Sequence, residues 1–115
     1  MKIATATLIE ATAFNNDVAK GIIARVLIGR NDGAPFCMRM FEIAPNGHTP
    51  RHMHDWEHEM FCHAGQGEVF GDGRWNPIAT GSVVFVKGGE EHQIRNTSDK
   101  PLVIICLIPS GVPEL

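Results

Sequence analysis

The chain has 115 residues, with 10 Lys and Arg against 13 Asp and Glu, and a net charge of −3 when its six histidines are neutral. This length predicts one domain around one hydrophobic core, and the lack of any basic run gives nucleic-acid binding no electrostatic support. No apolar stretch approaches the roughly 20 residues that a membrane-spanning helix needs.

Short apolar runs separated by turn-forming residues make up most of the chain. The segment 7–20 is the one stretch that could hold a short helix. Polar and glycine-rich clusters then divide the rest, at 31–33, 45–47, 71–73, 87–89 and 98–100. The strands predicted between them are 21–28, 36–43, 58–64, 67–70, 74–78, 82–86, 92–96 and 102–108. Many short strands at this spacing predict an all-β sandwich or barrel.

The cysteines and the first residues of the chain bear on its location. Cys37, Cys62 and Cys106 are odd in number and lack C-x-x-C spacing, so we expect free thiols in a reducing compartment. The opening residues show no charged stretch followed by a long apolar one, so no signal peptide is predicted. We therefore expect a cytoplasmic protein.

Four histidines are the main functional signal. His52, His54 and His58 lie within seven positions of one another, and His92 lies far downstream. Alternate residues of an extended strand face the same side, so His52 and His54 would point into one space. Histidine is the most frequent metal ligand among neutral side chains. The pattern predicts a transition-metal site.

The segments that carry these histidines resemble the two motifs of the cupin superfamily. The first family motif runs G-x5-H-x-H-x(3,4)-E-x6-G, and the segment 47–65 follows it. Gly47 lies one residue nearer the histidine pair than usual, and Gly65 and Gly67 straddle the position of the final glycine. The histidine pair itself falls in place.

The second family motif runs G-x5-P-x-G-x2-H-x3-N, and the segment 81–96 matches it closely. Gly81, Gly89, His92 and Asn96 occupy the family's positions, while Lys87 stands where the family usually has proline. This departure loosens the expected turn and leaves the histidine position unchanged. Both motifs occur in the right order with the right gap.

The resemblance covers residues from about 22 to 108 and implies a double-stranded β-helix, a jelly-roll-like cupin barrel of two antiparallel sheets. The whole chain, 1–115, would then be a single cupin domain. Metal ligands in such proteins come from both motifs and meet in the barrel mouth. By position in the motifs, His52, His54 and His92 are three of these ligands.

The fourth ligand is either His58 or Glu59. Many cupins use the glutamate of the first motif, to which Glu59 could correspond, whereas small cupins with W-E-H-E after the histidine pair use four histidines. Adjacent residues of a strand face opposite sides, so only one of the two can point inward. We favour His58. Four neutral imidazoles would leave a divalent ion with its full charge and two octahedral positions open.

The choice of metal follows from the donors and the resemblance. Imidazole suits Fe, Ni, Cu and Zn more than Ca or Mg, and the resemblance suggests manganese or iron. The cofactor expected is therefore a divalent transition metal, Mn or Fe first, with Zn, Ni or Cu as alternatives.

Three residues are candidates for the cavity wall. Arg39 lies mid-strand among apolar residues, so its charge must be paired or exposed; it could hold a substrate carboxylate or pair with Glu42. Cys106 lies in a strand predicted to be buried and is either a small core residue or a thiol near the metal. Ile104 would line the same face as Cys106.

Two histidines are expected outside the site. His63 would face outward if His58 faces inward, and His48 would lie at the rim, in the turn before the ligands. Asp55 and Glu57 are expected as solvated loop acids, with orientation of an imidazole as the alternative.

The function implied is a metal-dependent, oxygenase-type enzyme acting on a small organic molecule. The alternatives are an isomerase or lyase that uses the metal as a Lewis acid, and a non-catalytic module that binds or senses a small ligand. The partners expected are a small-molecule substrate or ligand and a second copy of the chain in a homodimer, with no nucleic acid and no membrane.

Overall fold

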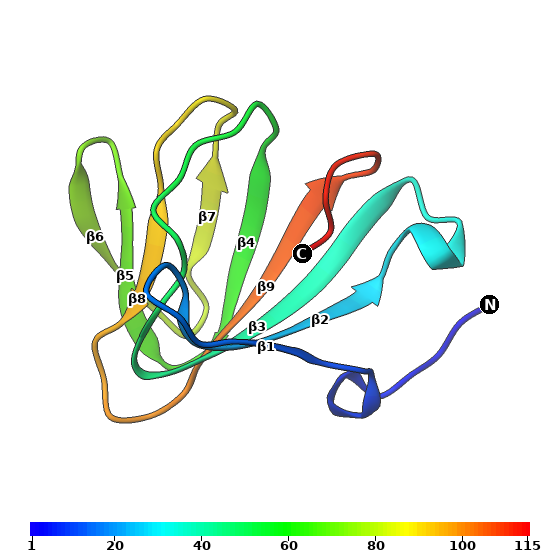
Figure 1. Ribbon diagram of the computed structural model, residues 1–115, viewed down its shortest axis with the longest axis horizontal. Coiled ribbons are helices and arrows are strands. Elements are labelled where there is room, and N and C mark those ends of the chain that lie inside the picture. Colours follow the sequence, from blue (N-terminus) through cyan, green and yellow to red (C-terminus); the bar gives the residue numbers. More distant parts are fainter.

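All 115 residues are described by the computed structural model (Figure 1), which contains nine strands and two short 3₁₀ turns. The turns are η1 (Ala6–Leu8) and η2 (Arg30–Asp32). The strands are β1 (Thr12–Phe14), β2 (Lys20–Ile28), β3 (Phe36–His48), β4 (His58–Ala64), β5 (Gln66–Gly71), β6 (Arg74–Ala79), β7 (Val83–Val86), β8 (Gln93–Asn96) and β9 (Leu102–Pro109). The prediction of an all-β fold is confirmed.

The strands form one antiparallel sheet that curls around its own interior. Its order is β6-β5-β8-β3-β9-β4-β7, with β2 on the other side of β3 and β1 on β2. Figure 1 shows β5, β6 and β8 on one side of the curl and β2, β3 and β9 on the other. The long β3 joins the two sides, because it pairs with β2 and β9 along most of its length and reaches β8 through His48 opposite Arg95.

The length of β3 differs from the prediction. The cluster 45–47 was expected to be a turn that ends the strand, but the strand continues through it to His48. The pairing with β2 jumps from Ile22 opposite Ile43 to Lys20 opposite His48, which marks an irregularity in the ladder. Asn46 takes a left-handed conformation there (φ 64°), which asparagine tolerates better than most residues. The turn chemistry therefore bends the strand and carries it to the other side of the barrel.

The prediction that the segment 7–20 could hold a short helix is wrong. The segment holds the end of η1, then β1, and then a turn around Asn16. The Asn16 Oδ1 atom accepts hydrogen bonds from the backbone N–H groups of Val18 (2.8 Å) and Ala19 (2.9 Å). Short polar side chains that bond the nearby backbone in this way favour turns over helices.

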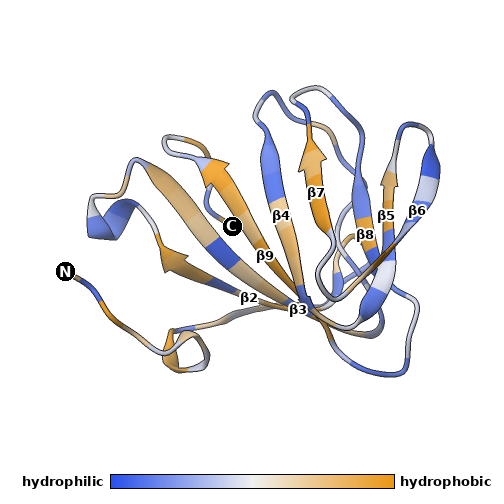
Figure 2. Cartoon of the chain, turned by 180° about the vertical axis from the view of Figure 1, so that it is seen from behind, coloured by the Kyte–Doolittle hydropathy of each residue, from blue (hydrophilic) through white to orange (hydrophobic).

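The core lies inside the curl and follows the two-residue period of the strands. In β4 the buried residues are His58, Met60 and Cys62, and their neighbours are exposed. In β9 the buried residues are Leu102, Ile104, Cys106 and Ile108. Figure 2 shows that β7 and β9 are among the most hydrophobic strands. All three cysteines are buried and unpaired.

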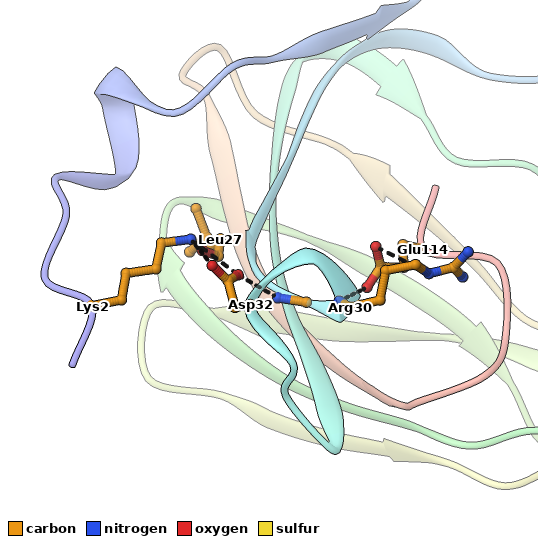
Figure 3. Close-up of polar contacts among 6 residues, drawn as sticks. Lys2, Leu27, Arg30, Asp32 and Glu114 are labelled. Carbon is orange, nitrogen blue, oxygen red and sulfur yellow. Dashed lines mark hydrogen bonds and ion pairs between the residues drawn. The ribbon is translucent and has the colours of Figure 1, made fainter.

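Polar contacts fasten the terminal segments to η2 (Figure 3). The Lys2 Nζ atom donates to the Leu27 carbonyl (2.8 Å) and forms an ion pair with Asp32 (3.0 Å). The Glu114 carboxylate accepts a hydrogen bond from the Arg30 backbone N–H (2.9 Å). The helical turns are three residues each, and no helix has the length and apolarity needed to cross a membrane.

Candidate metal centre

The four histidines of the sequence pattern meet at one end of the barrel interior. One ring nitrogen from each of His52, His54, His58 and His92 lies within 4.8 Å of the others. His58 begins β4, His92 directly precedes β8, and His54 lies in the connecting loop. His52 pairs with His92 through an isolated β-bridge, with backbone N–H···O distances of 3.1 Å and 3.0 Å. The segment 52–54 is thus no regular strand, and the bridge holds the two motifs together.

A close approach between the loop and the second motif fixes the position of His54. The Gly89 N–H donates to the His54 carbonyl at 2.7 Å, and Gly89 has a left-handed conformation (φ 80°). A Cβ atom on Gly88 would lie 2.3 Å from the Asp55 carbonyl oxygen. Only glycine fits at such a distance, so the glycines at this turn are what let the loop pack down beside His92.

Hydrogen bonds at Nδ1 set the tautomer of two of the histidines. His54 donates from Nδ1 to the Trp56 carbonyl (2.9 Å), and His92 donates from Nδ1 to the Glu90 carbonyl (2.8 Å). A carbonyl only accepts, so each Nδ1 carries a proton and each neutral ring keeps its lone pair on Nε2. For Asp55 and Glu57 the sequence predicted solvated loop acids, with this orienting role as the alternative; at His54 and His92 backbone carbonyls perform it.

The Nε2 atoms converge. The distance is 2.7 Å between His54 and His58 Nε2 and 3.1 Å between His52 and His92 Nε2. His54 and His92 each present a lone pair at Nε2, so distances this short need either a proton from the partner ring or a cation between the two nitrogens. A cation bound by several imidazoles would meet this need, so the donor set fits a transition metal.

The surroundings favour the neutral form of His52, His54 and His58. Burial, followed by the charge of Arg39, lowers the pKa of His58 to about 3. Burial, followed by the neighbouring His92, lowers the pKa of His52 to about 4, and the same two causes lower that of His54. Neutral imidazole is the metal-binding form.

The other candidates lie outside the group. Glu59 is exposed on the opposite side of β4 from His58, as is His63. His48 ends β3 and contacts the Thr49 carbonyl through Nδ1 (3.1 Å). His58 is therefore the residue of the adjacent pair that reaches the other histidines.

The far side of His58 faces Arg39 and Cys106. The His58 Nδ1 atom lies 3.1 Å from Cys106 Sγ and 3.2 Å from an Arg39 Nη atom, which also donates to Cys106 Sγ at 3.0 Å. Burial raises the pKa of the Cys106 thiol, against the opposing effect of Arg39. Glu42, the alternative partner of Arg39, pairs with Arg25 instead.

A cavity of about 180 Å³ opens beside the histidines, and Arg39, Ile104 and Cys106 line it. Most of the remaining wall is apolar: Phe14, Ala19, Ile22, Phe41, Pro50, Met60, Ile94 and Leu115. The reasoning from sequence missed Phe14 and Leu115, which come from opposite ends of the chain. It also missed Trp56, whose ring stacks on His54 with 4.1 Å between centroids. No local pattern signals either contact.

Comparisons with known proteins agree with this architecture. The cupin domain family, cupin 2, matches residues 39–108. The polyketide cyclase RemF from Streptomyces resistomycificus has a similar structure, with a TM-score of 0.89 and 31% identity over 98% of this chain and 82% of RemF.

Two curated relatives cover less of the chain. An oxalate-binding protein from Thermotoga maritima is 31% identical over 68 residues, or 58% of this chain, and 1-methylthio-D-xylulose 5-phosphate methylsulfurylase from Rhodospirillum rubrum is 24% identical over 86 residues, or 75%. The matches span 56% and 55% of those relatives, so this chain is similar to about half of each.

The fold and the site define the class: a jelly-roll β-barrel with a possible metal site of four histidines at its mouth. Within that class, the chain belongs to the cupin 2 family, whose match covers more than half of its residues. The resemblance inferred from the two motifs is confirmed.

Proposed function

We propose that this chain is a metal-dependent enzyme acting on a small organic molecule, with His52, His54, His58 and His92 as the metal ligands. The convergence of their Nε2 atoms beside an apolar cavity carries the proposal. The residues 1–115 would act as a single cupin domain.

The donor set bears on the metal. Imidazole suits Fe, Ni, Cu and Zn, and we keep Mn or Fe as the first expectation, with Zn, Ni and Cu as alternatives. A bound divalent ion would supply Lewis acidity or, if redox-active, a site for O2. The chain's own residues hold the ligands in place: Trp56 and Glu90 orient two rings through their carbonyls.

Two reaction classes fit this site. Lewis-acid chemistry, of the isomerase or lyase kind, is favoured by the similarity to RemF, which is a polyketide cyclase. Oxygenase chemistry is favoured by a set of four neutral nitrogen donors, which leaves two octahedral positions for substrate and O2. We rank the Lewis-acid class first, because the similarity to RemF extends over nearly the whole chain.

The test begins with metal content. The protein is purified, stripped with a chelator and reloaded separately with Zn, Mn and Fe(II), and the bound metal is measured by mass spectrometry. We expect one ion per chain, retained in the Glu59→Gln variant and lost in His58→Ala. The absence of any tightly bound ion would contradict the proposal.

Turnover then separates the two classes. Zinc has no redox chemistry, so a zinc-loaded protein that converts a β-dicarbonyl compound without consuming O2 supports the Lewis-acid class. Conversion that requires Fe(II) or Mn and consumes O2 supports the oxygenase class. The non-catalytic alternative gains weight from the similarity to an oxalate-binding protein, and binding of metal and ligand without turnover of any compound in such a panel would favour it.

The proposal includes a homodimer. Exposed apolar side chains gather on the outer face of β4 and β7, among them Phe61, Val83 and Phe85. They line an apolar groove of about 380 Å³ with Leu107 and Ile105 of β9. An exposed apolar patch of this kind commonly marks a protein–protein contact. Light scattering should give twice the chain mass, and Phe85→Lys should give the monomer; a monomeric wild type would refute the pairing.

We also propose a cytoplasmic location, because all three cysteines are unpaired and buried. Fractionation of cells that express the full natural protein tests this, and recovery from a secreted fraction would refute it. No nucleic-acid partner forms part of the proposal.

A further inference from the structure

Arg39 is a buried charge inside the barrel. It lies in the middle of β3, opposite Val26 of β2 and Cys106 of β9, and only 7% of its surface is exposed. A guanidinium group remains charged in proteins, and removing a charge from water is costly unless it is paired. The chain should therefore offer a counter-ion close by.

The chain offers none. The ion pairs of the structure are Lys2 with Asp32, Arg25 with Glu42, Arg30 with Glu114, and Arg95 with Glu68. In each pair the acid binds a cation other than Arg39, and no carboxylate lies within ion-pair distance of Arg39.

The neutral contacts of Arg39 leave part of its donor capacity unused. One terminal nitrogen donates to the Glu114 backbone carbonyl (3.1 Å), and the other reaches Cys106 Sγ (3.0 Å) and His58 Nδ1 (3.2 Å). The Nε atom is buried without any hydrogen-bond partner. If His58 binds through Nε2, its Nδ1 carries the ring proton and cannot accept from Arg39.

The cavity gives access to this charge. Arg39 and His58 lie on the same wall, and the rest of the lining is largely apolar. A volume of about 180 Å³ is close to that of an engineered cavity of about 150 Å³ that holds one benzene ring. A ligand enclosed by it has about one ring, and a larger polyketide would extend out of the mouth.

We infer that the cavity takes a small, mostly apolar organic acid whose carboxylate pairs with Arg39 while its body packs against Phe41 and Ile104. The assignment deepens the proposed function by naming the substrate class of the same site. It predicts that the acid group lies next to His58 and therefore beside the metal ligands.

Benzoate is a suitable probe, and benzamide is its neutral counterpart of nearly equal shape. Titration calorimetry on the full chain, both metal-loaded and chelator-stripped, should give tighter binding of benzoate by about 10- to 100-fold, the range expected for a hydrogen bond to a charged group. Arg39→Gln should remove this preference, and Arg39→Lys should restore part of it.

Arg25→Gln is the matched control, because Arg25 lies on the neighbouring strand β2, has its own acid partner and is absent from the cavity lining. Its benzoate affinity should equal that of the wild type. If Arg39→Gln fails to fold, the comparison of benzoate with benzamide in the wild-type protein decides whether the cavity prefers a carboxylate. Equal affinity for the two, binding of neither, or a preference that survives in folded Arg39→Gln would overturn the inference.

The stripped protein separates this inference from the proposed function. A preference for benzoate without metal reports Arg39 alone. A protein that binds no metal but keeps the preference would refute the metal centre and leave the acid site standing.

Discussion

The two faces of β4 and β9 contrast sharply, although they are formed by alternate residues of the same two strands. The inner face carries His58, Met60, Ile104 and Cys106, which line the cavity. The outer face carries Glu59, Phe61, Ile105 and Leu107 around the apolar groove. The difference teaches that one strand pair can present a cavity wall with a histidine on one side and an exposed apolar groove on the other, which suits the proposed chemistry and the proposed dimer contact respectively. Substitutions on the two faces should therefore have separable effects.

The largest effect should follow from His58→Ala. Loss of one of four ligands should weaken metal affinity by more than the roughly 10- to 100-fold seen when residues behind metal ligands are removed. Glu59→Ala, one position away on the outer face, should leave the affinity unchanged. Competition with a chromophoric chelator measures both. An equal loss in the two variants would contradict the assignment of His58 over Glu59.

A smaller effect should follow from shortening apolar residues of β9. Ile104 is 1% exposed, and truncation of a buried isoleucine costs about 2–5 kcal/mol. Ile105 faces outward and is half-buried, so Ile105→Ala should cost about 1 kcal/mol or less in the monomer. Urea denaturation of the metal-free Ile104→Ala and Ile105→Ala proteins, each in the Phe85→Lys background, compares them. Similar losses would mean that the faces are not distinct energetically.

The smallest effect concerns acid stability of the metal-free protein. His58 has a pKa of about 3 when folded, against about 6.5 in an unfolded chain. Below pH 6.5 the unfolded state binds a proton that the native state refuses, so the free energy of unfolding should fall as pH falls towards 3. Urea denaturation at pH 7.5, 6 and 5 measures the trend.

His58→Gln provides the control for acid stability, because it removes that titrating group from the inner face. Its stability should depend less on pH than that of the wild type. His63→Gln, on the outer face, should keep the full dependence. An identical pH dependence in all three proteins would show that the buried histidine contributes nothing to it.

Much of the fold followed from local pattern. The bounds of β4 match the predicted 58–64, and the other main strands differ from prediction by a few residues at their ends. The alternation along β4 predicted that only one of His58 and Glu59 faces inward, and the resemblance favoured His58, which is the buried residue of the two. Local signals predicted the alternation because the strand has one buried and one exposed face, but they did not say which face was buried.

What could not be predicted depends on contacts between distant segments. The turn residues at 45–47 bend β3 because β2 and β8 continue to pair beyond them. The carbonyls of Trp56 and Glu90 that orient the histidines belong to the backbone, which carries no residue-specific signal. Phe14 and Leu115 reach the cavity only through the tertiary fold.

The bridge between His52 and His92 has a consequence for metal choice. Two backbone hydrogen bonds brace these residues against each other without any contribution from their side chains. The spacing of the two motifs is thus set by the backbone before an ion binds. Ion binding is then not coupled to a folding step that could favour one ion over another. A frame assembled in advance favours ions whose size fits the spacing of its donors. We therefore expect the ion found in the purified protein to depend on this fit and on the supply in the growth medium, with Mn or Fe as the first expectation.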